Sequence, residues 1–331
     1  MNREPHERRT QGSEEVDPAQ RPLAVLLMGP TASGKTQVAV ELVQRLALEI
    51  ISVDSALIYR GMDIGTAKPD AATLAVAPHR LIDVRDPAEA YSAAEFRDDA
   101  LREMASIGAR GATPLLVGGS MLYFRALERG LARLPAADPA LRERLAAQAA
   151  DAGWPALHER LARLDPQAAA RIHRNDPQRI QRALEVHALT GVSLSTWWQR
   201  SRGAAADYRF LKIVLAPAER ALLHRRIALR FARMLEQGFV EEVSCLHRRG
   251  DLHPGLPAVR AVGYRQAWKY LDGELSASEW PDRALSATRQ YARRQLTWLR
   301  SETDAVWIDP LSEDAPRRLL NLLKKAGVAA T

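Results

Sequence analysis

The sequence predicts an α/β fold in which a doubly wound parallel sheet carries a phosphate-binding loop and a helical insertion domain. Strand-length apolar runs alternate with amphipathic helical runs from residue 23 to residue 127, the pattern of a parallel sheet covered by helices. The motif Gly-x-x-x-x-Gly-Lys-Thr follows the first apolar run directly, at residues 29–36. From residue 139 to residue 199 the helical period continues without any strand pattern, so this region is predicted to interrupt the sheet.

The glycine motif has the strand–loop–helix setting that a P-loop requires, because an apolar strand over residues 23–28 precedes it and a helix over residues 37–46 follows. The backbone N–H groups of such a loop, together with the helix N-terminus, bind anions. Lys35 is placed to reach terminal phosphates, and Thr36 to hold a magnesium ion. The motif indicates a polyphosphate ligand but not which one. It comprises Gly29, Pro30, Thr31, Ala32, Ser33, Gly34, Lys35 and Thr36.

Two further predicted strands, over residues 48–54 and 79–83, each end in an acidic residue. Ligands of open parallel sheets bind outside the carboxyl ends of the strands, so Asp54 is expected to face the phosphate loop. A helix cap or an indirect magnesium contact is the alternative role for this carboxylate. The polar, glycine-containing stretch 55–69 is predicted to be a binding loop.

The remaining elements are predicted from caps and periodicity. A capping box marks a helix that starts after Ser92 and ends near Ile107, and a helix over residues 178–189 is predicted between Asp176–Pro177 and Gly191. Strands are predicted over residues 114–120, 210–215 and 305–308, and other helices over residues 121–127, 219–237, 240–249, 264–271 and 282–300, with a last helix at the C-terminus. The predicted organisation is a disordered tail over residues 1–20, a core domain of residues 21–134 and 206–331, and a helical insertion over residues 135–205.

Composition narrows the class of protein. A net charge of +7 and a pI of about 9.8 fit a polyanionic partner, although charge alone fits a merely basic soluble protein equally well. No apolar run reaches the roughly 18 residues of a membrane span, and the charged N-terminus lacks the apolar region of a secretory signal. The single cysteine, Cys245, excludes an internal disulfide, fits the cytoplasm and is expected in the core. No zinc-binding spacing is present.

Arginine pairs and clusters recur in the second half of the chain. Basic side chains on rigid helices suit a nucleic-acid backbone, although any one cluster is more often a solvated face. Arg226 and Arg230 are four residues apart and suit a phosphate clamp, with ordinary surface charge as the alternative. Trp197 and Trp198 are expected to pack in the insertion rather than stack on a base, and His79 to be structural. The clusters are Arg179 with Arg182, Arg260 with Arg265, and Arg289, Arg293, Arg294 and Arg300.

Seven motifs, occurring in one order, resemble those of the bacterial tRNA dimethylallyltransferase (IPP transferase) family. The resemblance covers about residues 22 to 310 and departs at Ser120, where the family usually has threonine; serine keeps the hydroxyl. The motifs lie at residues 29–36, 53–69, 79–83, 117–123, 175–182, 262–266 and 294–298.

The resemblance implies transfer of a dimethylallyl group from dimethylallyl diphosphate to N6 of adenosine 37, in tRNAs that read codons starting with U. The phosphate loop and Arg230 would then hold the leaving diphosphate with Mg²⁺ as cofactor, Asp54 would act as general base, and Thr31 would contact the oxygen at the allylic carbon. The tRNA would bind through its anticodon stem-loop. Nothing in the sequence demands more than a monomer, so a monomer is expected. The implied tRNA contacts are Asp54, Ser55, Ala56, Leu57, Ser120, Gln178, Arg179, Ile180, Gln181, Arg182, Arg260, Ala261, Val262, Gly263, Tyr264, Arg265, Arg293, Arg294 and Gln295.

Two other functions stay open from the residues alone. The P-loop fits a small-molecule kinase, but that function leaves the arginine clusters and the insertion unexplained. The P-loop with basic charge also fits a nucleic-acid-stimulated ATPase, for which the sequence offers no arginine finger that we can name. ATP binding follows from the loop pattern in either case, whereas the resemblance makes the prenyl diphosphate the expected ligand.

Overall fold

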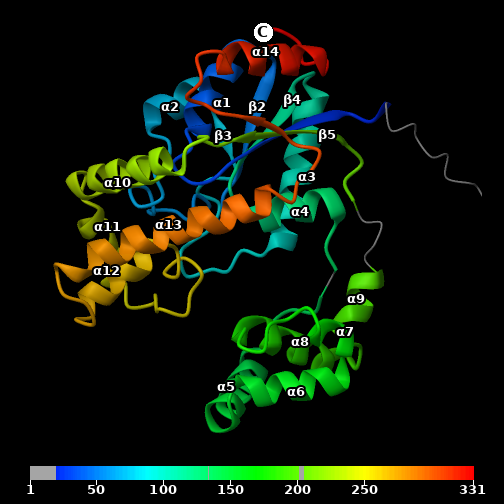
Figure 1. Ribbon diagram of the computed structural model, residues 1–331, viewed down its shortest axis with the longest axis vertical. Coiled ribbons are helices and arrows are strands. Elements are labelled where there is room, and N and C mark those ends of the chain that lie inside the picture. The colour runs from blue at the N-terminus through cyan, green and yellow to red at the C-terminus, as the bar shows by residue number, and fades with distance from the viewer. Residues whose placement is uncertain (1–19, 133, 201–204) are drawn as a thin grey trace, which may run out of the picture.

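The computed structural model of the chain describes residues 20–132, 134–200 and 205–331. Its centre is a parallel sheet in which the strands of the described residues follow the order β3-β2-β4-β1-β5-β6 (Figure 1). The predicted tail lies outside the described residues except for residue 20. The strands are β1 (Leu23–Met28), β2 (Leu48–Val53), β3 (His79–Arg80), β4 (Thr113–Gly118), β5 (Arg209–Leu215) and β6 (Val306–Ile308).

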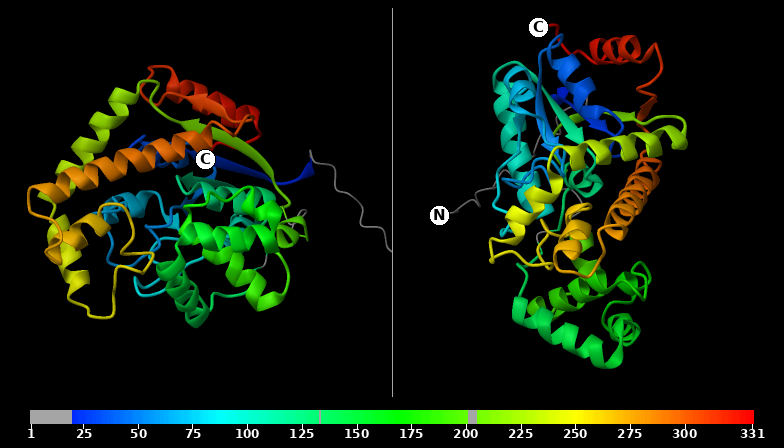
Figure 2. Two further views of the ribbon diagram at one scale, coloured as in Figure 1. Left: turned by 60° about the horizontal axis from the view of Figure 1, so that its bottom comes forward. Right: turned by 90° about the vertical axis from the view of Figure 1, so that its left-hand side faces the viewer.

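Helices cover both faces of the sheet, which confirms the doubly wound α/β class (Figure 2). Alternate residues of β1 enter two cores: Val25 and Leu27 pack with α1 (Lys35–Val43) and α14 (Ala315–Lys325), and Leu26 packs on the other face. That face carries α3 (Ala93–Ala109), α4 (Met121–Arg129), α10 (Arg220–Glu236), α11 (Phe239–His247), α12 (Tyr264–Leu271) and α13 (Glu279–Leu299).

The described residues of the predicted insertion form helices joined by turns, without a strand, and have an apolar core of their own, built around Leu161, Ile180 and Leu184. It lies at the bottom of Figure 1, below the sheet domain. Trp197 and Trp198 pack against this core, as expected. The domain boundaries themselves stay a prediction. The insertion contains α5 (Pro139–Ala152), α6 (Trp154–Leu164), α7 (Pro166–Ala169), α8 (Pro177–Thr190) and α9 (Leu194–Arg200).

Caps place the helix ends where the sequence predicted them. The Asp176 side chain accepts a hydrogen bond from the N–H of Arg179 at the start of α8, and Gly191 ends the helix at φ 68°. At α3, the Ser92 hydroxyl and the Glu95 carboxylate form the predicted capping box.

Three expectations were wrong. β3 has two residues instead of five, because Leu81 and Asp83 turn to φ 61° and 55° and leave the extended conformation. The short helix α2 (Ala71–Val76), capped by Asp70, was missed because it buries no residue and so carries no apolar period. Cys245 is exposed rather than in the core, because α11 buries its other face.

None of the helices within the described part of the chain is both long and apolar enough to span a bilayer.

Candidate active site at the phosphate loop

The phosphate loop joins β1 to α1 in a tightly constrained conformation. Gly34 has φ 96°, a conformation that favours glycine, and a Cβ on Gly29 would lie 2.2 Å from the carbonyl oxygen of Leu215. The Lys35 ammonium folds back on the loop, donating to the Pro30 carbonyl at 2.7 Å and the Ser33 hydroxyl at 3.4 Å. The loop's conformation is therefore fixed by contacts within the protein itself.

Burial lowers the pKa of Lys35 to about 7, with the Asp54 carboxylate opposing the shift and the Arg230 guanidinium adding to it. Burial also lowers the pKa of Arg230. The Asp54 carboxylate offsets the burial of these two cations only in part, and the negative charge of a polyanion would offset it further.

Helix α10 adds further cations to the loop. The Arg226 Nε donates to the Ala32 carbonyl oxygen at 2.8 Å, and the Arg230 guanidinium donates to the Thr66 carbonyl oxygen at 2.8 Å. Arg226, Arg230 and Arg233 line one cavity of about 690 Å³ together with the loop residues 31–37. The clamp interpretation of Arg226 and Arg230 fits this geometry better than ordinary surface charge does.

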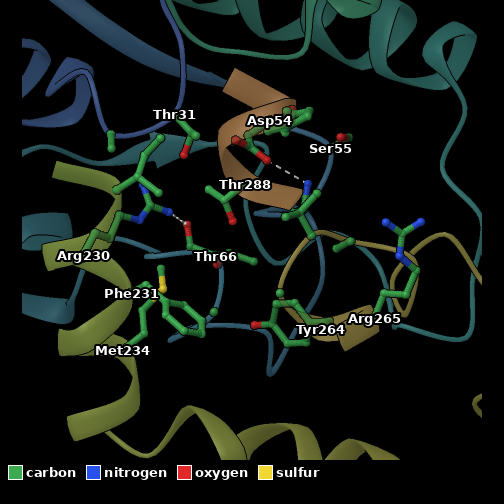
Figure 3. Close-up of a pocket in the computed structure, with 18 of the residues that line it drawn as sticks. Thr31, Asp54, Ser55, Thr66, Arg230, Phe231, Met234, Tyr264, Arg265 and Thr288 are labelled. Atoms are coloured by element: carbon green, nitrogen blue, oxygen red, sulfur yellow. Dashed lines mark hydrogen bonds between the residues drawn. The ribbon is translucent and has the colours of Figure 1, made fainter. Parts of the chain in front are cut away.

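A second cavity, of about 370 Å³, adjoins the first and has a large apolar wall (Figure 3). In the close-up, Thr31 and Asp54 lie on one side of this cavity, and Phe231 and Met234 from α10 lie on the other. Both cavities are lined by Thr31, Asp54 and Arg230. The site thus joins an anion cradle to an apolar pocket, with a hydroxyl and a carboxylate where they meet.

Asp54 is held in place at the carboxyl end of β2. One carboxylate oxygen accepts hydrogen bonds from the backbone N–H groups of Ala56 at 2.8 Å and Leu57 at 3.4 Å. The Ser120 hydroxyl, at the end of β4, accepts from the N–H of Ser55 at 3.0 Å and so ties this turn to the neighbouring strand. The carboxylate is therefore oriented by groups that do not depend on a ligand.

The predicted tRNA contacts fall into three groups. The first lines the apolar cavity: Asp54, Ser55, Ala56, Arg260, Ala261, Val262, Gly263, Tyr264, Arg265 and Arg294. The second, residues 178–182 on α8, lies in the insertion, where Gln178 and Arg179 are exposed. The third comprises the remaining contacts: Ser120 and Gln295, which are buried, Leu57, which lines the loop cavity, and Arg293, which is exposed on α13. Ile180 and Tyr264, from the first two groups, are buried as well.

Gln295 illustrates the buried contacts. Its amide oxygen accepts from the Thr31 N–H at 2.9 Å, and its amide nitrogen donates to the Gly119 carbonyl at 2.9 Å. Gln295 thus fixes the phosphate loop to the end of β4 with both of its polar groups. Arg182 is similarly engaged, donating to the Glu185 carboxylate at 2.6 Å and the Pro135 carbonyl at 2.7 Å.

Several residues of the site were not found from the sequence, among them Thr66, Tyr291 and Thr288. Tyr291 lines both cavities, and burial raises its pKa, with the Asp54 carboxylate adding to the shift. Thr288, Tyr291 and Gln295 follow a helical spacing on α13. That spacing indicates a shared face of the helix, although not that this face reaches the cavities.

A parallel sheet with Gly-x-x-x-x-Gly-Lys-Thr between β1 and α1 defines this chain as a P-loop α/β protein, and the two adjoining cavities offer room for an anion beside an apolar group. A family model described as IPP transferase matches residues 57–302. The chain belongs to the IPP transferase family.

Relatives and solved structures agree with this family. The tRNA dimethylallyltransferase of Thioalkalivibrio sulfidiphilus is 64% identical over 280 residues, 85% of this chain and 88% of that one. The tRNA dimethylallyltransferase of Methylococcus capsulatus is 60% identical over 291 residues, 88% and 93% of the two chains.

Among solved structures, the full-length tRNA isopentenylpyrophosphate transferase of Bacillus halodurans has a TM-score of 0.67 at 37% identity, over 93% of this chain and 98% of that one. A eukaryotic dimethylallyltransferase acting on tRNA has a TM-score of 0.76 over 90% and 78% of the chains, and at 24% identity it supports the fold alone.

Proposed function

We propose that this enzyme is a tRNA dimethylallyltransferase that moves the dimethylallyl group of dimethylallyl diphosphate to N6 of adenosine 37, in tRNAs reading codons that start with U. The observation that carries the proposal is the junction of the two cavities at Thr31 and Asp54. A prenyl diphosphate has an anionic end for the cradle and an apolar end for the wall of Phe231 and Met234. The named relatives perform this class of reaction.

The phosphate loop would stabilise the leaving group. Negative charge grows on the diphosphate as the allylic C–O bond breaks, and preorganised donors stabilise such charge without reorganising. Lys35 and Arg230 already line the cradle, together with Arg226. The Thr31 hydroxyl, at the junction, would donate to the oxygen that leaves the allylic carbon.

Asp54 would act as general base. The lone pair of the adenine N6 amine is delocalised into the ring, so loss of a proton as the C–N bond forms favours attack. With one carboxylate oxygen held by the backbone of residues 56 and 57, the carboxylate presents a fixed acceptor to the junction. Tyr291 and Thr288 would help to orient the adenine there.

The residues present fit the Mg²⁺ that the family implies. Thr36 and Asp54 offer oxygen donors in the loop cavity, and the buried Ser52 hydroxyl lines the same cavity without a hydrogen-bond partner among the described residues. Mg²⁺ prefers oxygen ligands and keeps several waters, which need polar neighbours. Thr36 would hold the ion, which when bound neutralises diphosphate charge.

The anticodon stem-loop would lie across the apolar cavity and the insertion. Exposed arginines at positions 260, 265, 293 and 294 surround this side, and Gln178 and Arg179 are exposed on α8. Adenosine 37 is unpaired in its loop, so turning it into the site costs only stacking, about a few kcal/mol. We further propose that the protein acts as a cytoplasmic monomer: the single cysteine fits a reducing compartment, and the site as described needs no residue from a second copy.

A two-substrate label experiment tests this function. Purified protein with magnesium and an unmodified A36-A37-A38 stem-loop receives labelled dimethylallyl diphosphate, and a parallel sample receives γ-labelled ATP. Label should reach the RNA from the prenyl donor only, and should be lost in Asp54→Ala. Phosphate release or transfer from ATP, without prenyl transfer, would instead establish the kinase or ATPase alternative.

A further inference from the structure

The loop that contains Thr66 is held by a partly buried hydrogen-bond network beside the second cavity. Glu242, in the first turn of α11, accepts three consecutive backbone N–H groups: Asp63 at 2.8 Å, Ile64 at 2.7 Å and Gly65 at 3.1 Å. The same carboxylate accepts the Tyr264 hydroxyl at 2.5 Å. One side chain thus satisfies four donors and fixes the path of this segment.

Packing against aromatic rings also constrains the backbone of residues 63–66. A Cβ on Gly65 would lie 2.2 Å from Cε2 of Phe239 and 2.6 Å from the Tyr264 ring, so the backbone lies directly on these rings. Lys68, whose side chain is 5% exposed, anchors the other end through the Tyr59 carbonyl at 2.8 Å and the Asp83 carboxylate at 2.5 Å. The segment between the two anchors contains Thr66.

The position of Thr66 in turn determines where Arg230 lies. The Thr66 carbonyl oxygen accepts from the Arg230 guanidinium at 2.8 Å, and this bond is visible in Figure 3. Arg230 is largely desolvated, so its direction depends on the few acceptors it reaches. The chain of contacts runs from Glu242 through residues 63–65 to the Thr66 carbonyl and then to the guanidinium that lines both cavities.

We infer that Glu242 is a positioning residue for diphosphate binding: it holds the 63–66 backbone so that the Thr66 carbonyl directs Arg230 into the anion cradle. The inference rests on the proposed function for the identity of the donor, but its test needs only inorganic diphosphate. Tyr264 supports Glu242 by donating its hydroxyl, and burial together with the Glu242 carboxylate raises the pKa of that hydroxyl.

Glu242→Gln provides the test, because the amide keeps one acceptor oxygen and places an N–H₂ group against backbone donors. The affinity of the Mg²⁺-loaded protein for inorganic diphosphate, measured by calorimetry, should fall about tenfold. Glu241→Gln, an exposed neighbour on the same helical turn, is the matched control and should change it less than about twofold. Tyr264→Phe removes a single donor and should give a smaller loss, which preserves the test if Glu242→Gln folds poorly.

A double-mutant cycle separates positioning from general damage. In an Arg230→Ala background, Glu242→Gln should cost little further diphosphate affinity, because the group it positions is gone. The inference would be overturned if Glu242→Gln lowered diphosphate affinity equally in the wild-type and Arg230→Ala backgrounds, or if it did not lower the affinity in the wild-type background. If the double-mutant cycle gives the expected diphosphate affinities but the protein transfers no prenyl group, only the proposed function is contradicted. The two failures are therefore distinguishable.

Discussion

Asp54 offers a clean test of chemistry at the level of a single residue. Asn in its place retains an oxygen that accepts the N–H groups of Ala56 and Leu57, so the turn should keep its conformation. The amide cannot take the proton of the adenine amine. We therefore expect Asp54→Asn to lower kcat by about 10²–10⁴-fold. Single-turnover transfer and stem-loop binding would be measured in parallel, and binding should stay within a few fold of wild type.

The control for that prediction is Asp98→Asn, an exposed carboxylate on α3 far from the cavities. A normal rate in Asp54→Asn would assign the base to another group.

The lowered pKa of Lys35 predicts how the affinity for diphosphate depends on pH. Because burial lowers its pKa to about 7, the free protein loses this positive charge as pH rises above that value. A bound diphosphate favours the charged form, so binding at pH 8 should take up as much as one proton, and binding at pH 6 much less. Affinity should therefore fall with rising pH above about 7. Calorimetry in buffers of different ionisation enthalpy measures the uptake.

Lys35→Met is the matched variant for the pH prediction. It should bind diphosphate more weakly and show no extra proton uptake at pH 8. Equal uptake by both proteins would assign the linkage to another group.

At the residue scale, site residues that lie in a local sequence motif were predictable. Site residues that reach the cavities from distant parts of the same chain were not. Residues 29–36 form a motif of fixed spacing, and Asp54 ends a recognisable strand. The sequence alone therefore predicted that both lie at the phosphate-binding end of the sheet. Thr66 enters the site through its backbone carbonyl, which leaves no side-chain signature. Tyr291 was missed because only the packing of α13 against α4 and α10 brings it near Asp54.

Helix α13 shows how one element fixes another. Gln295 spans from the Thr31 N–H to the Gly119 carbonyl, and a Cβ on Gly119 would lie 2.3 Å from its amide nitrogen. Gln295→Ala should leave two buried groups unpaired, at about 1–3 kcal/mol of unfolding free energy each. It should also loosen the phosphate loop and raise the KM for the prenyl donor.

Gln290→Ala on the exposed side of α13 gives the comparison for Gln295→Ala. Urea unfolding and donor KM would be measured for both variants. A similar stability loss in both variants would mean that α13 depends on side-chain packing in general, rather than on a specific link to the phosphate loop, since alanine does not lower helix propensity.

Strands that are buried on both faces were predicted more accurately than strands that are only partly buried. β1 was predicted at the bounds that the structure gives, since both faces of Leu23–Met28 are buried and every residue is apolar. The predicted length of β3 was too great, because the apolar residues Leu81 and Ile82 continue the strand pattern. In the structure the backbone turns at Leu81 and Asp83, which have positive φ. Strain of that kind is invisible to an apolar pattern.

At the scale of the whole molecule, the alternation of strands and helices predicted the fold class but not the strand order. β4, not β2, lies beside β1, and β5 returns to its other edge after the whole insertion. Nothing in residues 139–199 specifies where the chain rejoins the sheet. The separate apolar core of the insertion indicates that it has a stability of its own.

Glu185 links that core to the segment joining it to the sheet domain. Its side chain is 0% exposed and accepts from the Asp138 N–H at 2.9 Å, Arg142 at 2.8 Å and Arg182 at 2.6 Å. Burial alone would raise the pKa of Glu185, but hydrogen bonds from Arg142 and Arg182 outweigh it and the pKa is lowered. The stabilisation is therefore present at neutral pH and is lost as pH falls through the lowered pKa.

Glu185→Ala should consequently destabilise the insertion by about 1–3 kcal/mol, because the Asp138 N–H and two arginines lose their acceptor. The loss stays moderate because the Arg142 and Arg182 side chains are 42% and 26% exposed and can bind water instead. Hydrogen exchange should rise in α5, α6 and α8 while β1 and α1 keep their protection. Donor binding should persist and stem-loop binding should weaken, since the insertion would no longer present Gln178 and Arg179 rigidly. Glu159→Ala, an exposed carboxylate on α6, is the control and should leave both unchanged. Equal loss of protection in the sheet would show instead that insertion and core unfold as one cooperative unit.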